Sequence, residues 1–351
     1  MTRKLATVRT IAELKPIEGA DLIELAIVDG WQCVVKKGEH KVGDKVVYFE
    51  VDSFIPATLP FMESFKERFT VFNGVEGLRV RTIKLRGQIS QGVIVSILTL
   101  PFEAYRTFVD EDISLDEVLG IVKYERPERQ GGSFGYNGTA KGNFPWWISK
   151  TDQDRVQNMP WVLNSDELFE VTIKLDGSSC TIYNLEEGSK YSPDGNGVVG
   201  VCSRNIDLKE EAGGKFWEAA KDLGIIDAIK GCGRDLAIQG ELIAPSIQGN
   251  FEGVTQPEIH IYDVFDIEGQ KYLSPTERLQ VLSGLGLEHL AIKQVGIGSP
   301  ATMFGGDLSK ALDYAEGDGL YSGYREGVVF KSFVSNRSFK IISNQYLLKE
   351  K

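Results

Sequence analysis

The segment FEVTIKLDGSSCTIY, Phe169 to Tyr183, holds two β-prone runs joined by a short polar stretch. Valine, isoleucine, threonine and aromatic residues favour strands, and an Asp-Gly pair is typical of a tight turn. Lys174 ends the first run, so its stem is expected to be partly buried and its amine partly desolvated. Because desolvation favours the neutral, nucleophilic amine, this lysine is a candidate for covalent catalysis. An ordinary surface lysine before a turn is the alternative.

The rest of the chain divides by composition. Its length of 351 residues indicates about two domains, and 42% apolar with 25% charged residues indicates a globular chain. Residues 1–124 contain short alternating runs broken by glycine turns, which predicts a small β-barrel of the OB type. Residues 125–145 are rich in glycine and polar residues and are expected to form a linker or mobile loop. Residues 146–351 mix many strands with few helices, which predicts an α+β domain built on antiparallel sheets.

Two helices and seven strands are expected in this second domain. One helix is predicted over Leu208–Leu223 from apolar residues at helical spacing. The other opens with SPTERLQVL, where Ser274 is placed to cap the helix, Pro275 to start it and Glu277 to complete a capping box. The expected strands are Glu167–Ile173, Ser179–Asn184, Val198–Ser203, Asp235–Leu242, His260–Ile267, Gly327–Phe333 and Ser338–Ser343.

Composition also limits location and partners. The N-terminus has no signal-peptide pattern and no apolar run approaches the ~20 residues that cross a bilayer, so we expect a cytoplasmic protein without membrane contact. The four cysteines are widely spaced and are expected to be reduced, and the three histidines fall in unrelated segments. The net charge of −11 is unlike that of a general nucleic-acid coat protein. Any nucleic-acid binding must therefore rest on local basic patches.

Five further short motifs follow K-L-D-G along the chain. They are CSRN with Arg204, AIQGELIAP with Glu241, IYDVFDI with Phe265, REGVVFKSF with Glu326 and Lys331, and SFKIIS with Lys340. Each is weak alone, since an isolated phenylalanine in a strand is more often a core residue than a ligand platform. In this order they resemble the covalent nucleotidyltransferase superfamily of ATP-dependent ligases and capping enzymes. The fold implied for residues 146–351 is an ATP-grasp-like ligase adenylation domain.

Domain order narrows the resemblance. DNA ligases and capping enzymes usually carry an OB domain after the catalytic core, whereas here the predicted barrel comes first and eleven residues follow Lys340. The stretch WWISKTDQDRVQNMPWVL, residues 146–163, contains the string K-T-D-x-x-R-x-Q-N found in a broad group of RNA ligases. The chain thus resembles the Naegleria-type RNA ligases with an N-terminal OB domain. A DNA ligase, a capping-type nucleotidyltransferase and a non-catalytic nucleic-acid-binding protein are the alternatives.

The resemblance implies an ATP-dependent RNA ligase that acts in RNA repair, as a monomer, on RNA with 3′-hydroxyl and 5′-phosphate ends. It would form a lysyl-AMP on Lys174 and then an adenylylated RNA 5′ end, with Mg²⁺ or Mn²⁺. The implied catalytic residues are Lys174, Asp176, Glu241, Glu326, Lys331 and Lys340. The implied nucleotide contacts are Ile173, Lys174, Gly177, Arg204, Glu241, Phe265, Lys331 and Lys340, with Phe265 stacked on adenine. The implied metal ligands, through water, are Glu326, Asp176 and Glu241.

Three further details of the sequence bear on ligand binding. Gly177 and Gly240 are expected to leave room for a ligand near the backbone. Relatives often have two lysines two residues apart in the last motif, whereas Ser338 and Ile342 flank Lys340 here. In the barrel, the segment LRVRTIKLR supplies a basic candidate surface for RNA, and a solvated strand face is the alternative. Its basic residues are Arg79, Arg81, Lys84 and Arg86.

Overall fold

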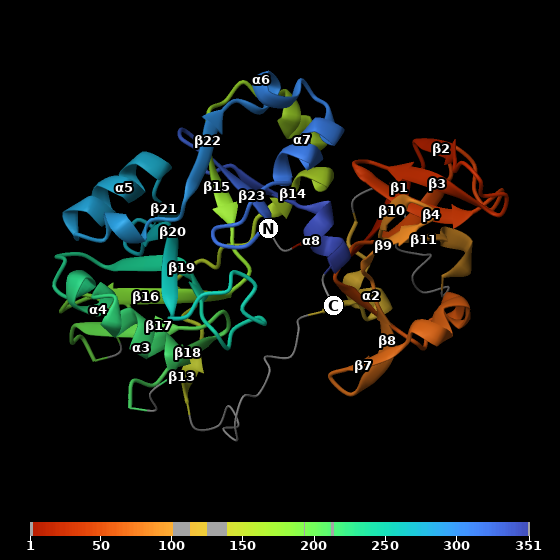
Figure 1. Ribbon diagram of the computed structural model, residues 1–351. Coiled ribbons are helices and arrows are strands. Elements are labelled where there is room, and N and C mark those ends of the chain that lie inside the picture. Colours follow the sequence, from red (N-terminus) through yellow and green to blue (C-terminus); the bar gives the residue numbers. More distant parts are fainter. Residues whose placement is uncertain (1–2, 101–112, 125–138, 193, 212–213, 350–351) are drawn as a thin grey trace. The chain divides into compact units, whose positions relative to one another are not determined.

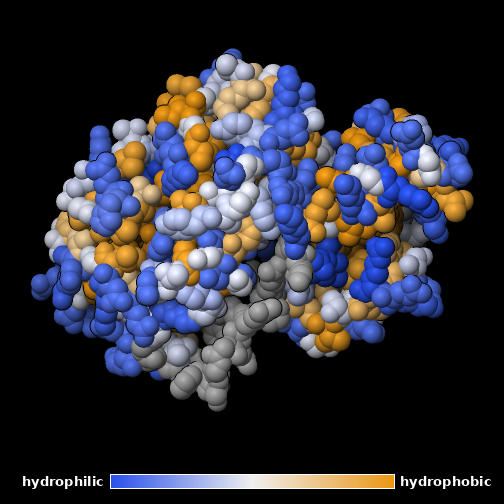
Figure 2. Space-filling model, viewed as in Figure 1, coloured by the Kyte–Doolittle hydropathy of each residue, from blue (hydrophilic) through white to orange (hydrophobic). Residues whose placement is uncertain are grey.

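The computed structural model describes residues 3–100, 113–124, 139–192, 194–211 and 214–349. The chain separates into two compact units (Figure 1). The N-terminal unit comprises residues 1–128, 156–160 and 347–351, and the C-terminal unit comprises residues 129–155 and 161–346. The face seen in Figure 2 is largely hydrophilic with scattered hydrophobic residues, as expected for units whose apolar residues are mostly internal.

Short antiparallel strands make up the N-terminal unit. The described strands form four sheets, with the orders β1-β5-β11, β2-β3-β4, β9-β10 and β12-β6-β8-β7. The strands are β1 (Ala6–Thr10), β2 (Glu13–Pro16), β3 (Ile23–Val28), β4 (Trp31–Lys36), β5 (Lys45–Phe49), β6 (Ser53–Pro56), β7 (Thr70–Phe72), β8 (Val75–Arg79), β9 (Thr82–Leu85), β10 (Gln88–Gln91), β11 (Val93–Ser96) and β12 (Val122–Lys123). A 3-10 helix spans Pro60–Arg68, another spans Ile97–Thr99, and α2 spans Asp116–Leu119.

Strand β5 contributes side chains to two hydrophobic clusters in this unit. Because successive side chains of a strand point to opposite faces, Val47 and Phe49 join one cluster while Val46 and Tyr48 join the other. The strand therefore has apolar neighbours on both of its faces. Short antiparallel strands of this kind agree with the small β-barrel predicted for the first domain.

Two larger sheets form the C-terminal unit. The seven-stranded sheet has the order β13-β18-β17-β16-β19-β20-β21, and the five-stranded sheet has the order β14-β24-β23-β15-β22. Their strands are β13 (Ala140–Asn143), β14 (Asp154–Arg155), β15 (Phe169–Lys174), β16 (Ser178–Leu185), β17 (Val198–Cys202), β18 (Ile206–Leu208), β19 (Leu236–Ile243), β20 (Glu258–Asp266), β21 (Lys271–Tyr272), β22 (Gln294–Gly298), β23 (Gly327–Ser332) and β24 (Ser338–Ile342). All the named pairs are antiparallel except β14 with β24.

The helices of this unit are short. They are α3 (Lys215–Asp222), α4 (Ile225–Ile229), α5 (Pro275–Gly284), α6 (Pro300–Phe304) and α7 (Leu308–Ala315), with a 3-10 helix at Glu288–Leu290. The 3-10 helix Val156–Asn158 belongs to the N-terminal unit, and the 3-10 helix Pro160–Asn164 and α8 (Asn344–Lys349) each contain residues of both units. None of the helices within the described residues is both long and apolar enough to cross a membrane.

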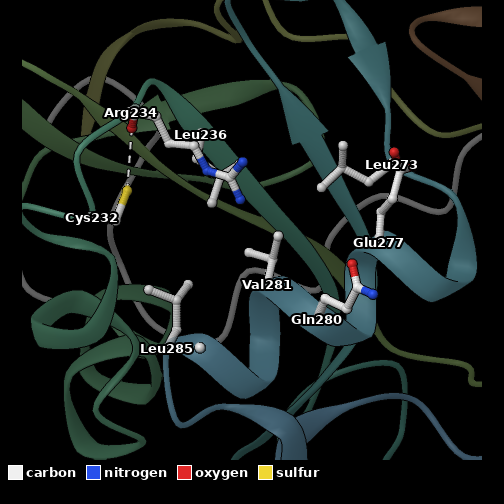
Figure 3. Close-up of a pocket in the computed structure, with 9 residues that line it drawn as sticks. Cys232, Arg234, Leu236, Leu273, Glu277, Gln280, Val281 and Leu285 are labelled. Carbon is white, nitrogen blue, oxygen red and sulfur yellow. Dashed lines mark hydrogen bonds between the residues drawn. The ribbon is translucent and has the colours of Figure 1, made fainter.

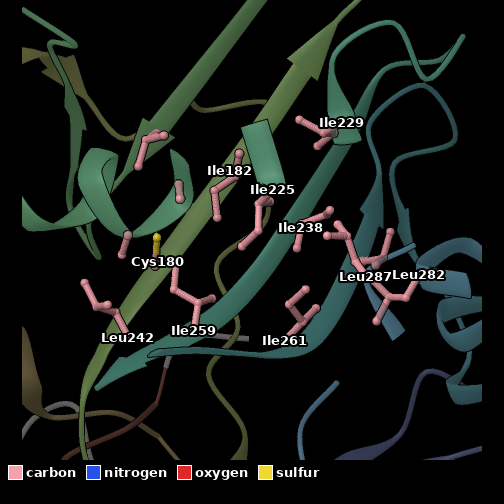
Figure 4. Packing of buried hydrophobic residues seen from close by; sticks show 14 of the residues in the cluster. Cys180, Ile182, Ile225, Ile229, Ile238, Leu242, Ile259, Ile261, Leu282 and Leu287 are labelled. Carbon is pink, nitrogen blue, oxygen red and sulfur yellow. The ribbon is translucent and has the colours of Figure 1, made fainter. Parts of the chain in front are cut away.

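One face of the seven-stranded sheet carries the main core. Even-numbered residues of β16 and β19, such as Ile182, Ile238 and Leu242, pack against residues of α3, α4 and α5 (Figure 4). Odd-numbered residues of the same strands therefore point to the opposite face. Tyr183 and Ala237 belong there to a separate cluster, and Glu241 follows Ala237 on that side. This second face is the one that carries the candidate site.

The seven predicted strands are confirmed, each within two residues at either end. The capping box of α5 is also confirmed, because Ser274 and Glu277 bond reciprocally. The helix predicted over Leu208–Leu223 was too long. Leu208 ends β18, and the helix starts only at Lys215, after Gly214 with a φ of 117°, a value that side-chain-bearing residues rarely adopt.

The segment predicted as a linker, residues 125–145, lies partly outside the described residues, from 125 to 138. Its described end is not a free linker, because Ala140–Asn143 forms β13 and pairs with β18. The K-T-D-x-x-R-x-Q-N string is divided between the units. Arg155 pairs with Lys340 in the C-terminal unit, whereas Asn158 lies in the N-terminal unit and accepts a hydrogen bond from Trp31 Nε1 at 2.7 Å.

Candidate active site

The pairing of β15 with β23 creates the centre of the site. It places Lys174 opposite Gly327, the residue after Glu326, although the two strands are far apart in sequence. Lys174 Nζ lies 2.7 Å from Glu326 Oε1, and the lysine side chain is 27% exposed. A side chain at Gly327 would place Cβ 2.2 Å from the carbonyl oxygen of Ile341, so only glycine fits beside this glutamate.

Two more carboxylates surround the same amine. Glu241 reaches it from β19, and its Oε1 accepts a hydrogen bond from the backbone N–H of Gly177 at 3.0 Å. Asp176 lies in the turn after β15, and its charge also acts on Lys174. Burial raises the pKa of Glu241 to about 8, although the ammonium group of Lys174 acts in the opposite direction. Burial therefore favours the protonated form of Glu241.

The expectation of a lowered pKa at Lys174 is wrong for this state of the protein. Burial of the amine acts to lower its pKa, but the charges of Glu326, Glu241 and Asp176 outweigh it and raise the pKa above its ordinary value. The amine is thus an ion-paired ammonium group. The sequence indicated the burial correctly, but it could not show how many carboxylates the fold would gather around this nitrogen.

The two motif glycines allow neighbouring strands to pack closely. A Cβ at Gly177 would lie 2.4 Å from the carbonyl oxygen of Leu242 in β19. A Cβ at Gly240 would lie 2.8 Å from the side chain of Ile259 and 2.9 Å from the carbonyl oxygen of His260. Both glycines therefore allow strands to approach closely, and this approach brings Glu241 to the lysine.

A second cluster joins two of the predicted nucleotide contacts, Lys340 and Arg204. Asp152 Oδ1 lies 3.3 Å from Lys340 Nζ, and its Oδ2 lies 3.8 Å from a terminal nitrogen of Arg204. Lys340 extends from β24 of the five-stranded sheet, and Arg204 from the loop after β17 of the seven-stranded sheet. Asp152 therefore ties the two sheets together through their cations. Sequence reasoning quoted the string that contains Asp152 but assigned this residue no role.

Lys331 belongs to a third, buried group of charges. Its Nζ donates to Asp263 Oδ1 and, at 2.7 Å, to the carbonyl oxygen of Tyr262. Burial lowers the pKa of Lys331, although Asp263 acts in the opposite direction. Arg278 of α5 donates to the same carbonyl at 3.0 Å and to Glu170 Oε1 at 2.7 Å. In this structure Lys331 therefore neutralises Asp263, and sequence reasoning missed its three charged neighbours.

The remaining nucleotide candidates are core residues. Phe265 is 1% exposed and packs edge-on against Tyr272 with ring centroids 5.0 Å apart. It lies on the sheet face that carries Glu241, but neither side of its ring is open for adenine, which corrects the expected stacking role. The side chain of Ile173 is also buried, in a cluster with Leu175 and Ile243. A β-strand pattern alone does not distinguish a covered ring from an open one.

The basic residues predicted in the barrel differ in their environments. Arg79 lies over the ring of Tyr124, 4.3 Å from its centroid, and 3.6 Å from Asp52. Arg81, Lys84 and Arg86 are exposed. Arg86 and Gly87 form the turn between β9 and β10, with φ angles of 47° and 83° as a two-residue hairpin turn requires. Arg79 is thus a structural contact, whereas the other three are accessible.

The donor set around Lys174 fits a hydrated divalent cation. Within the described residues, no three His, Cys, Asp or Glu side chains converge closely enough to ligate a metal directly. Glu326 Oε2 is nevertheless buried and accepts no hydrogen bond from the described part of the chain. Oxygen ligands and bound water are what Mg²⁺ prefers, so Glu326, Glu241 and Asp176 suit contact through water.

A pocket elsewhere in the C-terminal unit is separate from these clusters. It has a volume of about 470 Å³ and lies between α5 and the start of β19 (Figure 3). Leu236, Leu273, Val281 and Leu285 supply its apolar walls, and Arg234 extends over them. None of the predicted site residues lines it, so it is not part of the candidate active site.

Comparisons with known families agree with this geometry. Residues 5–97 match an OB-fold domain family, and residues 167–342, half of the chain, match the RNA ligase family. The chain belongs to the RNA ligase family. The match to this family spans the segment that holds Lys174, Glu241, Glu326 and Lys340. A search of curated proteins returned no match for this RNA ligase.

Solved structures resemble this RNA ligase over nearly its whole length. They include a lysine-to-alanine variant of Naegleria gruberi RNA ligase with ATP and Mn, at 38% identity and a TM-score of 0.86, covering 98% of each chain. A lysine-to-methionine variant with AMP and Mn has 38% identity and a TM-score of 0.87, again covering 98% of each chain. The same ligase with PPi has 38% identity and a TM-score of 0.86, covering 99% of this chain and 98% of that one.

Proposed function

We propose that this RNA ligase uses ATP to join 3′-hydroxyl and 5′-phosphate ends of RNA through a lysyl-AMP intermediate. It would act as a monomer in the cytoplasm. The observation that carries the proposal is the Lys174 amine, held 2.7 Å from Glu326 with Glu241 and Asp176 also acting on it. A lysine that is fixed in a partly buried, charged site is suited to covalent catalysis. The similarity to a ligase solved with ATP, AMP and PPi supports the same nucleotide here.

In the first step, neutral Lys174 Nζ would attack the α-phosphorus of ATP and form an N–P bond as pyrophosphate leaves. Glu326 would orient the amine, since it already holds this nitrogen in the free protein. Mg²⁺ or Mn²⁺, contacted through water by Glu326, Glu241 and Asp176, would offset their negative charge and favour the neutral amine. Positioning and charge stabilisation of this kind supply most of the rate in phosphoryl transfer.

Lys340 and Arg204 would supply positive charge for phosphate groups. Both side chains remain partly accessible, at 13% and 39% exposure, and Asp152 is their shared anionic partner in the free protein. A phosphate group that displaced the Asp152 carboxylate would find two cations already assembled. In the later steps AMP would pass to the RNA 5′-phosphate, and the 3′-hydroxyl would displace it to seal the strand.

Labelling with nucleotide tests the proposal directly. The protein is incubated with α-labelled ATP and Mn²⁺, and Lys174→Ala serves as the matched variant that lacks the nucleophile. We expect wild type to acquire an acid-stable, hydroxylamine-sensitive AMP adduct and the variant to acquire none. A chase with nicked RNA should then release AMP and seal the strand. Absence of label in wild type would indicate a non-catalytic nucleic-acid-binding protein.

Two further arms separate the alternative enzymes. Labelling from GTP in place of ATP would identify a capping-type nucleotidyltransferase. Sealing of nicked DNA in preference to nicked RNA would identify a DNA ligase. Each of these outcomes contradicts the proposed substrate while leaving covalent catalysis by Lys174 intact.

A further inference from the structure

An aromatic–basic surface on the C-terminal unit has no part in the nucleotide site described above. We define it by Phe144, Trp146, Lys150, Lys190 and Tyr191. Trp146 is 86% exposed, and its ring lies edge-on to Tyr191 with centroids 6.1 Å apart. Single exposed hydrophobic residues are ordinary, but an exposed indole that is supported by further aromatic rings and flanked by lysines is a combination typical of nucleic-acid-binding surfaces.

The two lysines of this surface are positioned by aromatic rings. Lys190 Nζ lies 4.9 Å from the ring centroid of Tyr191, and none of the described carboxylates forms an ion pair with it. Lys150 Nζ lies 5.1 Å from the ring centroid of Phe144 and donates to Asn205 Oδ1 at 2.9 Å. Cation–π contacts hold an ammonium group in place without neutralising its charge. The surface therefore combines two ammonium groups with aromatic rings, on a chain whose net charge is −11.

Part of the aromatic–basic surface lies beside the loop that carries Arg204. The backbone N–H of Phe144 donates to the carbonyl oxygen of Asn205 at 2.9 Å, so this segment runs beside the loop that carries Arg204. Arg204 in turn shares Asp152 with Lys340. Contacts thus lead from Phe144 and Lys150 through Asn205 to the loop that carries Arg204, and Trp146 lies two residues along the chain from Phe144.

We propose that this surface binds the RNA strand that carries an end to be sealed, with an unstacked base against the Trp146 ring and phosphates near Lys150 and Lys190. The inference rests on the proposed function, because the strand bound by this surface would be the same RNA whose end Arg204 and Lys340 would hold. The two lysines suit the phosphates of a nucleic acid, and a flat exposed ring favours an unstacked base over a regular duplex. Single-stranded RNA next to the break is therefore the specific occupant.

Substitution of Trp146 gives the first test. The probe is a fluorescent, 5′-phosphorylated single-stranded RNA, and the readout is its dissociation constant from fluorescence anisotropy. Loss of one base–aromatic stack should weaken binding of Trp146→Ala roughly 5- to 150-fold, while Trp146→Phe should retain most of the affinity. Trp161→Ala is the matched control, because Trp161 is 57% exposed in the same unit and lies under Arg337, 5.3 Å from its ring centroid. The control should bind as wild type does.

Salt dependence gives the second test. Each lysine that meets a phosphate of a single strand contributes about 0.7 to the slope of log affinity against log salt concentration. Lys150→Ala with Lys190→Ala should therefore flatten the slope by about 1.4. Lys221→Ala is the control, since Lys221 lies over the ring of Trp217 at 5.5 Å but pairs with Glu210 at 2.8 Å. Its slope should equal that of wild type.

Adenylylation by ATP alone separates this inference from the proposed function. Trp146→Ala should acquire the AMP adduct at the wild-type rate, because no RNA takes part in that step. If wild type forms no adduct, the proposed function fails. If wild type forms the adduct but Trp146→Ala binds RNA as tightly as Trp161→Ala, the RNA surface is wrong and the proposed function stands. Equal loss of adduct and RNA binding in Trp146→Ala would make this residue structural and overturn the inference.

Discussion

The buried pair between Arg278 and Glu170 offers a quantitative test of what holds the site's scaffold together. Arg278 is 1% exposed and Glu170 is 2% exposed, and their charged atoms are 2.7 Å apart. Arg278→Met leaves the Glu170 carboxylate buried without its partner. Removal of one member of a buried pair costs about 3–5 kcal/mol. For a unit of this size each kcal/mol lowers the melting temperature by about 2–4 °C, so a drop of roughly 6–20 °C is expected.

The double variant Glu170→Met with Arg278→Met is the informative comparison. Arg278 Nε and Glu170 Oε2 are both buried without a hydrogen-bond partner in the described residues, so the pair is incompletely satisfied. Replacement of both charges by apolar side chains should therefore recover most of the lost stability, and it leaves the Lys331–Asp263 pair electrically balanced. The free energy of unfolding and the melting temperature of each variant can be measured by tryptophan fluorescence. This signal reports mainly on the C-terminal unit, since four of the five tryptophans lie there.

A surface pair provides the control for this experiment. Arg337 lies 2.5 Å from Glu167 but is 37% exposed, so Arg337→Met should cost no more than about 1 kcal/mol. The reasoning is refuted if Arg278→Met costs as little as Arg337→Met. It is also refuted if the double variant is as unstable as the sum of the two single variants, because the buried charges would then be favourable in themselves.

Three further changes test separate parts of the site. The folded pKa of Glu241 is about 8, whereas an unfolded glutamate has a pKa of about 4.3, so the free energy of unfolding should fall as pH rises between these values. In EDTA, Glu241→Gln should therefore melt at a higher temperature than wild type at pH 9 and at the same temperature near pH 4. A lower melting temperature of the variant at pH 9 would contradict this. Gly177→Ala should cost about 1–3 kcal/mol in urea unfolding, since its Cβ meets strand backbone at 2.4 Å, whereas Gly323→Ala, with open space around it, should be neutral. Asp152→Asn removes a counter-charge of Lys340, so pyrophosphate should inhibit adenylylation of this variant at a concentration up to about fivefold lower than it does for wild type. Unchanged inhibition would argue against phosphate binding by Lys340.

Local features of the chain were predictable because short-range physics determines them. The run before Lys174 alternates β-prone residues and forms β15, and the turn after it leads into β16 as expected. The capping box at Ser274 fixes the start of α5. Arg278 was missed on that helix, although Leu282 lies four residues later on the same face and is fully buried. A charged residue on the apolar stripe of a helix is the signal that could have revealed the pair with Glu170.

Long-range features could not be read from the sequence. The motif order suggested that Lys174 and Glu326 share a site, but only strand register places them 2.7 Å apart. The burial of Phe265 depends on Tyr272 and on neighbours from other strands, and no single motif contains that information. Gly177 was correctly noted as special, yet the atom that demands a glycine there belongs to Leu242, on a different strand.

The electrostatic state of Lys174 links these long-range contacts to the proposed reaction. The charges of three carboxylates act on a single amine and raise its pKa, while burial raises the pKa of Glu241. The carboxylates therefore favour the protonated form of the amine. A divalent cation that arrives with ATP would reverse this balance, since it competes with the proton for the same carboxylates. Nucleophile activation would therefore depend on nucleotide binding, which keeps the lysine unreactive until its substrate is in place.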